Sequence, residues 1–324
     1  MADIVSTRPD GKAAIAAALP PLEAGACIAI PTETVYGLAA DATNPRAITR
    51  IYETKGRPSF NPLICHMADL AMAERHALFD PLSRKLAERF WPGPLTLILP
   101  LRADSTIHAL ATAGLETVGI RVPLGFPGAL IAAFGKPLAA PSANTSGRIS
   151  PTTAAHVFED LGGKIPLILD GGAAPVGVES TILKVENGVI RLLRPGGLSA
   201  EAIEAATGLT VQRPEKAGAI IEAPGMLASH YAPEAAMRLN ATHVEPGEAL
   251  ITFAGAAPQG LETAALVLDL SPAGDLAEAA ANLFHMMKLA DASGARRIAV
   301  TAIPENGLGE AINDRLQRAA APKS

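Results

Sequence analysis

The chain has 324 residues, of which 49% are hydrophobic and 18% are charged, and its formal net charge is −5. This length leaves room for two domains, because a single hydrophobic core stops growing at roughly 250–300 residues. The composition excludes a disordered chain, and the acidic balance argues against a general nucleic-acid-binding protein, whose surface is usually basic.

Short apolar runs alternate with helix-like segments between residues 12 and 169. We expect strands at residues 27–30, 63–66, 95–101, 118–122, 138–140 and 167–169. We expect helices at residues 12–19, 45–54, 70–78, 81–90, 127–134 and 153–161. Pro20 and Pro21 predict the end of the first helix. Asn44 followed by Pro45 predicts the start of the second, since Asn is a good N-cap and Pro fits the first helical position.

A hairpin is predicted after these elements. Asn187-Gly188 separates two strand-like runs at residues 180–186 and 189–194, and this dipeptide is the strongest short hairpin signal. Because a hairpin pairs its strands antiparallel, the sheet must be mixed rather than purely parallel. Ser199 then caps a short helix that ends near Thr207.

Residues 211–239 show no periodicity and are rich in Pro, Gly and Ala, so we expect a linker there. Beyond it, strands at residues 249–253, 265–268 and 298–302 alternate with helices at residues 276–290 and 310–320. This alternation predicts a small, parallel, Rossmann-like α/β domain. The expected division is therefore a large α/β domain (1–210), a linker (211–239) and a C-terminal α/β domain (240–324).

Two polar loops in the first domain have the composition of a binding site. The apolar run 28–30 stops at Pro31 and opens into Thr32, Glu33 and Thr34. In α/β sheets ligands settle at such strand ends. Farther on, Lys55 and Arg57 lie on a loop punctuated by Gly and Pro, an arrangement that suits a phosphate-bearing ligand.

No standard nucleotide motif explains these loops. Gly172 and Gly177 have the spacing of a phosphate-binding loop, but Val178-Glu179 stands where that motif needs Lys-Ser/Thr, and a carboxylate there would repel phosphate. What remains is a dispersed set of cations and hydroxyls near predicted strand ends. Each has an ordinary structural interpretation when taken alone: Arg121 could be an edge-strand charge, and His66 a buried histidine with satisfied hydrogen bonds.

Taken together, these segments resemble one family. The motifs are Pro31–Leu38, Lys55–Pro58, Asn61–Leu63, Trp91–Thr96, Pro141–Asn144, Ser150-Pro151, Glu179–Ile182 and Leu193–Gly196. Their order resembles the YrdC-like family, the threonylcarbamoyl-AMP synthases, over about residues 10–210. Residues 223–226 and 230–233 look like the linker of its longer, two-domain members. The resemblance implies a YrdC-like fold, a mixed twisted sheet with flanking helices.

The resemblance also implies an activity, in which L-threonine, bicarbonate and ATP condense to threonylcarbamoyl-AMP and pyrophosphate for threonylcarbamoyladenosine modification of tRNA. Mg²⁺ would accompany ATP, with no dedicated protein-held metal. The family motifs assign L-threonine binding to Thr34, His66, Arg121, Ala140 and Ser180. They assign ATP binding to Lys55, Arg57, Asn61, Thr117, Ser142, Ser150, Arg194 and Tyr231, with Lys55 and Arg57 as the catalytic pair.

Several points stay open at this level. The segment around Tyr231 is expected to fold over the site as a lid, although it could be a passive tether. Downstream tRNA threonylcarbamoyl transferase proteins are the expected partners, with a possible weak tRNA contact. The alternatives are an RNA-binding module, or a carbamoyl-transfer module of the same fold that serves another acceptor.

The remaining features are ordinary. Cys27 and Cys65 lie in apolar runs and are expected to be buried thiols rather than a disulfide or a metal pair. No signal-peptide pattern and no long apolar run is present, so we expect no membrane association and a cytoplasmic location.

Overall fold

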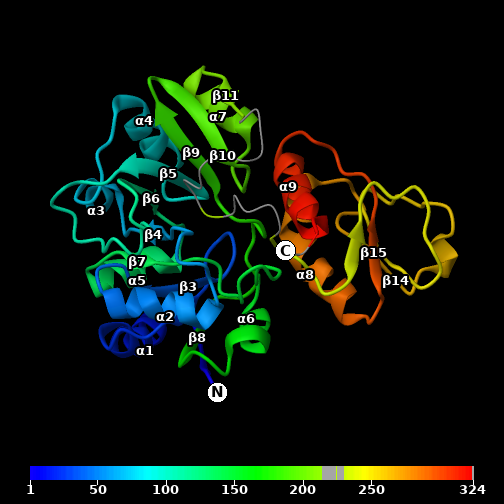
Figure 1. Ribbon diagram of the computed structural model, residues 1–324, viewed down its shortest axis with the longest axis horizontal. Helices are drawn as coiled ribbons and strands as arrows, with labels where there is room; N and C mark the ends of the chain where they lie inside the picture. Colours follow the sequence, from blue (N-terminus) through cyan, green and yellow to red (C-terminus); the bar gives the residue numbers. More distant parts are fainter. Residues whose placement is uncertain (214–223, 225–229, 323–324) are drawn as a thin grey trace.

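The computed structural model of the protein describes residues 1–213, 224 and 230–322. These residues form a large lobe and a small lobe, each built on its own sheet (Figure 1). Within the described residues, the large sheet has the strand order β1-β8-β2-β3-β7-β4-β6-β5-β9-β10-β11, and the small sheet has the order β12-β15-β13-β14. The predicted α/β class with a second, smaller α/β unit is confirmed.

The large lobe combines short strands with helices that pack on the sheet. Its strands are β1 (Asp3–Ser6), β2 (Ile28–Ile30), β3 (Gly37–Asp41), β4 (Ile64–His66), β5 (Leu95–Pro100), β6 (Thr117–Arg121), β7 (Leu138–Ala139), β8 (Leu167–Asp170), β9 (Thr181–Glu186), β10 (Val189–Arg194) and β11 (Val211–Gln212). Its helices are α1 (Lys12–Glu23), α2 (Pro45–Lys55), α3 (Leu70–Glu74), α4 (Pro81–Phe90), α5 (Phe126–Phe134), α6 (Ala154–Leu161) and α7 (Ala200–Thr207).

The large sheet is mixed, as the hairpin signal predicts. Strands β9 and β10 pair antiparallel around Asn187 and Gly188, whose φ angles of 52° and 77° are those of a tight hairpin turn. Strands β2 and β3 also pair antiparallel, whereas β4 and β6 are parallel. This last pairing matters for the site because it carries two strand ends to the same edge.

The prediction that the first helix ends before Pro20-Pro21 is wrong. Helix α1 continues through both prolines to Glu23. Each proline removes one backbone donor, but Ala14, Ala18 and Leu22 lie on one fully buried stripe that holds the last turn in place. Packing of the apolar stripe therefore outweighs the local signal.

Strands β1, β3, β11 and β12 were not predicted from the sequence, and one predicted helix is too long. Strand β1 is an edge strand with an exposed pattern, and β3 is a run of small residues, so neither shows the usual apolar alternation. Helix α3 ends at Glu74 instead of near Leu78, because the backbone N–H of Leu78 donates to the carbonyl oxygen of Pro100, the last residue of β5.

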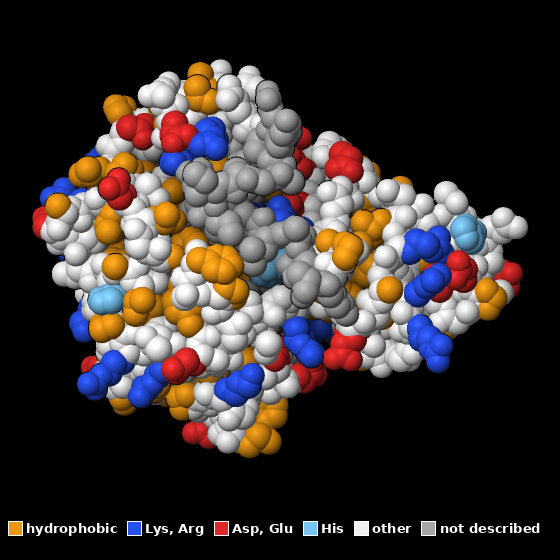
Figure 2. Space-filling model, in the orientation of Figure 1, with side chains coloured by type: hydrophobic (Ala, Val, Ile, Leu, Met, Phe, Trp, Pro, Cys, Tyr) orange, Lys and Arg blue, Asp and Glu red, His pale blue; other side chains and the backbone are white. Residues whose placement is uncertain are grey.

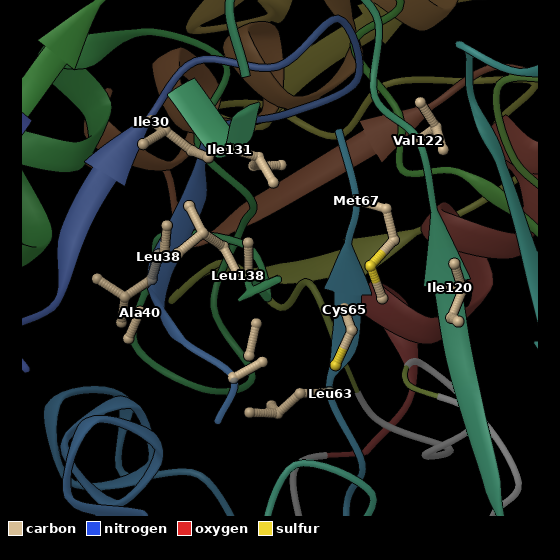
Figure 3. Close-up of a cluster of buried hydrophobic side chains, with 14 of the residues drawn as sticks. Ile30, Leu38, Ala40, Leu63, Cys65, Met67, Ile120, Val122, Ile131 and Leu138 are labelled. Carbon is tan, nitrogen blue, oxygen red and sulfur yellow. The ribbon is translucent and has the colours of Figure 1, made fainter. Parts of the chain in front are cut away.

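The core of the large lobe lies where the central strands face α5. Figure 3 shows side chains from β2, β3, β4, β6, α5 and β7, among them Ile30, Leu38 and Ile131, gathered in one cluster. Cys27 and Cys65 are buried free thiols, as expected, and burial raises the pKa of each to about 12. A rigid core at this position fixes the strand ends that carry polar side chains.

Helix α2 leads directly into the site. The Asn44 side chain accepts a hydrogen bond from Arg46 N, which confirms the predicted cap. The helix ends at Lys55, and Gly56 follows with a φ of 60°. That left-handed residue turns the chain, so that Arg57 enters the interior as well.

The small lobe is a parallel α/β unit, as predicted. Its sheet comprises β12 (Ala236–Arg238), β13 (Ala249–Thr252), β14 (Leu266–Asp269) and β15 (Arg297–Val300), with a 3-10 turn at Leu261–Thr263. Helices α8 (Leu276–Ala292) and α9 (Leu308–Ala320) lie between this sheet and the large lobe (Figure 1). Two of the short strands, β11 and β12, lie within the segment 211–239 that the sequence marks as a linker.

The lobes share an apolar contact. Val35, Ile149 and Val178 of the large lobe belong to the same buried cluster as Phe284 and Ile312 of α8 and α9. The helices in the described part of the chain include none that is long and apolar enough to cross a membrane.

Candidate functional site

One pocket in the large lobe collects most of the residues that the sequence singles out. Nine of the thirteen expected site residues line it: Thr34, Arg57, His66, Arg121, Ala140, Ser142, Ser180, Arg194 and Tyr231. They are far apart in the sequence, and the sheet brings them together. The other four, Lys55, Asn61, Thr117 and Ser150, do not line the pocket.

These four residues lie behind or beside the residues that line the pocket. Lys55 is fully buried and donates from Nζ to the backbone oxygens of Ser142 and Asn144. Ser150 is buried and donates to Glu179, which lines the pocket. Asn61 is buried beside Arg57, whose Nε donates to Asn61 O over 3.2 Å. Thr117 starts β6 and is half-buried.

Strand pairing places the first group. In the parallel register of β4 and β6, His66 lies opposite Arg121, so both side chains stand at neighbouring strand ends. Strand β7 adjoins β4, and the backbone N–H of Ala140 donates to Ile64 O over 3.0 Å. The edge of the sheet thus presents a histidine, an arginine and a peptide group to one hollow.

Arg121 is held by the loop after β2. Its Nη1 donates to Thr34 Oγ1 over 2.8 Å, its Nε donates to Gly93 O over 3.2 Å, and its Nη2 lies 2.7 Å from Glu33 Oε1. The contact with Glu33 is an ion pair without hydrogen-bond alignment, since Nη2 finds no hydrogen-bond partner among the described residues. Arg121 is therefore oriented and still has N–H groups to offer a ligand.

His66 is neutral near pH 7. Burial lowers the pKa of His66 to about 3, and the Arg121 charge adds to this effect. Its Nδ1 is buried and has no hydrogen-bond partner among the described residues. An imidazole in this state can donate or accept one hydrogen bond without adding a second cation beside Arg121.

Lys55 and Arg57 form a second cationic corner. Burial lowers the pKa of Lys55 well below its usual value, and the Arg57 charge lowers it further. Burial also lowers the pKa of Arg57, to about 10. The two carbonyl bonds from Lys55 fix the loop that carries Ser142, so this lysine shapes the pocket wall from behind.

Arg194 closes the opposite wall. Its Nε and Nη2 donate to Ser180 O over 3.2 and 2.8 Å, and Nη1 donates to Pro224 O over 3.3 Å. Ser180 Oγ lies 2.8 Å from Thr96 Oγ1. Burial lowers the pKa of Arg194. Three guanidinium groups, from Arg57, Arg121 and Arg194, thus face one hollow, and buried cations of this kind favour an anionic ligand.

Two carboxylates temper this positive charge. Glu33 pairs with Arg121, and Glu179 accepts from Ser150 Oγ over 2.5 Å and from Arg315 Nε over 2.8 Å. Burial opposes ionisation of Glu179, but the charges of Arg315 and Arg194 and the hydrogen bonds from Ser150 and Arg315 outweigh burial and lower its pKa. Glu179 therefore stays ionised in the pocket wall.

The start of the small lobe covers one side of the pocket. Tyr231 is buried, has a φ of 62° and stacks on Phe284 of α8 with ring centroids 5.5 Å apart. His230 lines the pocket too, and burial lowers its pKa to about 3. The N–H of Ala232 donates to Gly147 O over 2.8 Å. These contacts fix the chain against the large lobe.

Four residues that shape this site were not among those assigned to it from the sequence: Glu33, Glu179, His230 and Arg315. Glu33 and Glu179 lie inside recognised motifs, and an acid embedded among apolar and hydroxyl residues is itself a sign of a buried ion pair. His230 is next to Tyr231 in the sequence. No sequence signal pointed to Arg315, because it lies on an amphipathic helix outside all the recognised motifs.

The described residues contain no group of three or more His, Cys, Asp or Glu that could hold a metal ion. At the pocket, the oxygen atoms that could bind a metal ion belong to isolated hydroxyls and to two carboxylates, Glu33 and Glu179, which are already paired with arginines. This set fits a divalent cation only if the ligand supplies most of the coordinating oxygens.

Comparison with known proteins identifies relatives along the whole chain. Residues 21–196 match a family model described as "Telomere recombination", and residues 198–321 match one described as "Threonylcarbamoyl-AMP synthase, C-terminal domain". The threonylcarbamoyl-AMP synthase of Bacillus subtilis is 41% identical over 98% of this chain and 95% of its own length. That of Pyrococcus abyssi is 40% identical over 91% of each. The crystal structure of P. abyssi Sua5 complexed with L-threonine superimposes with a TM-score of 0.86, 37% identity and coverage of 99% and 97% of the two chains.

Proposed function

Because the chain belongs to the threonylcarbamoyl-AMP synthase family, we propose that its pocket condenses L-threonine, bicarbonate and ATP into threonylcarbamoyl-AMP and pyrophosphate. The observation that carries the assignment of the site is the convergence of Arg57, Arg121 and Arg194 with hydroxyl side chains on one buried hollow. The product is the intermediate for threonylcarbamoyladenosine in tRNA.

The reaction needs positioning and charge stabilisation more than acid or base catalysis. The amine of threonine and bicarbonate combine to a carbamate with loss of water. A carbamate oxygen then attacks the α-phosphorus of ATP, and pyrophosphate leaves. Both reactants are anions, so the protein must hold like charges together and stabilise the charge that develops on phosphorus.

Threonine would lie between β4, β6 and the loop after β2. The carboxylate would take the N–H groups of Arg121 that its protein partners leave, while neutral His66 and the Ser180 hydroxyl would face the substrate's polar groups. Thr34 would share the same corner, because it already accepts a hydrogen bond from Arg121. The peptide group at Ala140 would complete this end of the pocket.

ATP would lie toward the opposite wall. Arg57, Arg194 and Ser142 line the pocket there and would contact the nucleotide directly. Lys55 would act chiefly by fixing the Ser142 loop, and its lowered pKa marks it as a functional group. Asn61 and Thr117 would complete the nucleotide's surroundings, and Ser150 would act at the contact with Glu179.

Mg²⁺ would enter with ATP and be coordinated mainly by phosphate oxygens, where it neutralises charge on the triphosphate. Tyr231 would keep water from the labile mixed anhydride, as part of the proposed lid 211–239 between the domains 1–210 and 240–324. Residues 214–223 and 225–229 of that segment lie outside the described residues. The buried Tyr231 and its stack on Phe284 favour this role over that of a passive tether.

The product would pass to tRNA threonylcarbamoyl transferase proteins. Figure 2 shows Lys and Arg side chains interspersed with Asp and Glu over the face that it presents, rather than gathered in one basic surface. On this face the distribution, together with the net charge of −5, favours a weak tRNA contact at most over an RNA-binding module. The full-length similarity to threonylcarbamoyl-AMP synthases favours the synthase over a carbamoyl-transfer module with another acceptor.

Pyrophosphate release from ATP tests the proposal when each substrate is omitted in turn. Release should require both L-threonine and bicarbonate, and L-serine should replace L-threonine poorly. Turnover without threonine, or none with all three substrates, would refute the assignment. Equal turnover with serine would instead point to the carbamoyl-transfer alternative.

A further inference from the structure

A carboxylate is an unexpected group in the wall of a pocket for ATP. Glu179 lines the same hollow as Arg194 and is buried, with 7% of its surface exposed. Unneutralised, its charge would repel a triphosphate and draw the Arg194 guanidinium toward itself. Its first oxygen, Oε1, accepts a hydrogen bond from the Ser150 hydroxyl, so Glu179 orients a residue of the proposed nucleotide site.

The second oxygen of Glu179 is neutralised from the other lobe. Arg315 of α9 donates from Nε to Glu179 Oε2 over 2.8 Å and from Nη1 to Pro195 O over 2.8 Å. The side chain of Arg315 is completely buried. Its guanidinium carbon also lies 5.3 Å from the ring centroid of Tyr231, so it supports two parts of the pocket wall.

Arg315 does not serve the core of its own lobe. Its buried neighbours on α9, among them Ile312 and Leu316, are apolar or small and belong to the apolar cluster that the two lobes share. Burying a guanidinium in a helix interface costs several kcal/mol unless it is paired. Arg315 has two carboxylate partners: its neighbour Asp314 on α9 accepts from Nη1 over 2.7 Å, and the buried Glu179 lies across the interface, 136 positions earlier in the sequence.

A second ion pair joins the same helix to the large lobe and provides a comparison. Arg213 donates to Glu310 of α9 over 2.6 and 2.9 Å, but its side chain is 50% exposed and that of Glu310 is 21% exposed. Neither residue lines the pocket. If α9 needed only anchoring to the large lobe, this pair and the apolar contact would already supply it.

We propose that Arg315 is a positioning residue of the nucleotide site: it neutralises Glu179 from the C-terminal domain, so that this carboxylate can hold Ser150 without repelling the phosphates of ATP. This inference rests on the proposed function. It makes the C-terminal domain a part of the ATP site through one side chain. Arg315 acts through Glu179 and Tyr231.

The test compares ATP and threonine in calorimetry and steady-state kinetics of the full-length chain. Arg315→Met should weaken ATP binding at least about tenfold, equivalent to ~1.4 kcal/mol, and change threonine affinity less than about threefold. Glu310→Gln, which breaks the exposed pair on the same helix, is the matched control and should leave ATP affinity unchanged.

The decisive variant is the double substitution Arg315→Met/Glu179→Gln. Once the carboxylate charge is removed, the unpaired negative charge no longer opposes ATP, so affinity should return to within about threefold of wild type. A role in anchoring alone predicts that the double variant stays as impaired as Arg315→Met, and that outcome would overturn the inference. So would wild-type ATP affinity in Arg315→Met, or equal losses for both substrates.

If Arg315→Met does not fold, Arg315→Lys retains the charge and loses the bond to Pro195. Its ATP affinity should remain within about threefold of wild type, whereas a tenfold loss would contradict the charge argument. The inference and the proposed function can fail separately. If the wild-type chain releases no pyrophosphate, the function fails, and ATP calorimetry still decides whether Arg315 acts on nucleotide binding.

Discussion

The two lobes use the same kinds of elements but bury charge differently. Among the described residues of the large lobe, Glu33, Lys55, Arg57, Arg121, Asp41, Glu179 and Arg194 are buried. In the small lobe the buried charges are Glu248, paired with Arg238, and Arg315, which points out of its own core. The small sheet is held mainly by apolar packing, and its one buried carboxylate among the described residues, Glu248, has an arginine partner. Four of the buried charges in the large lobe, those of Arg57, Arg121, Glu179 and Arg194, line one pocket and therefore mark a ligand site.

The largest effect on stability is expected at the contact between the lobes. Gly177 has a φ of 75°, and a Cβ atom there would lie 2.3 Å from Ala280 O of α8. Gly177→Ala should therefore cost roughly 2–4 kcal/mol of unfolding free energy in chemical denaturation, from strain and overpacking together.

Gly188→Ala is the matched control for this substitution. Gly188 has a φ of 77° but nothing within 4 Å of its Cβ position, so only the conformational cost of about 1 kcal/mol should appear. Equal losses in the two variants would mean that the close approach of the lobes contributes nothing.

Removing a cation from the pocket should lower the catalytic rate. Arg57→Ala and Arg121→Ala should each lower the rate of pyrophosphate release at least about tenfold, since each loses a charged contact worth over ~1.4 kcal/mol in the transition state. Arg46→Ala removes an exposed cation from α2, the helix that leads to Lys55, and should keep the wild-type rate. Unchanged rates in the first two variants would contradict the proposed site.

A buried neutral histidine should leave a signature in the pH dependence of stability. The pKa of His66 is about 3 in the fold, against its ordinary 6.5, so on acidification the unfolded chain takes up this proton first. The stabilising effect is complete above about pH 6.5 and is lost as pH falls below that value. Between pH 6 and 5, His66→Gln should reduce the slope of unfolding free energy by ~1 kcal/mol per pH unit.

His243→Gln, at an exposed position of the small lobe, is the control for that measurement. The other buried histidines are present in both proteins, so the difference in slope reports His66. Identical slopes for the wild type and His66→Gln would show that His66 titrates as freely in the fold as in the unfolded chain.

The smallest effect should come from the exposed pair between the lobes. Arg213→Ala removes an ion pair with Glu310 whose arginine side chain is 50% exposed. Such pairs contribute about 0.2–1 kcal/mol, less at high salt. The loss should therefore be near the detection limit of denaturation curves. If Arg213→Ala lost more than ~2 kcal/mol of unfolding free energy, exposed ion pairs would matter as much to this protein as buried ones.

Local signals predicted most elements of the fold. The N-cap at Asn44 and the hairpin at Asn187-Gly188 depend on neighbouring residues alone, so sequence reasoning found them. Strand β1 and the passage of α1 through Pro20-Pro21 depend on packing against distant segments, which no window of sequence contains.

The same distinction governs the site. The motifs named Arg57, Arg121, Ser142 and Arg194, and all four line one pocket. They could not show that Arg121 is held by Glu33, or that Lys55 points at backbone carbonyls behind the wall. Arg315 was out of reach because its partner Glu179 comes from the other lobe, and pairing across an interface leaves no local pattern.

A crystal structure with L-threonine and a non-hydrolysable ATP analogue tests the central claim most directly. Both molecules should lie in the one hollow, with the threonine carboxylate on Arg121 and the nucleotide against Arg194 and Ser142. Threonine bound away from Arg121, or a nucleotide in a separate cleft, would contradict that claim.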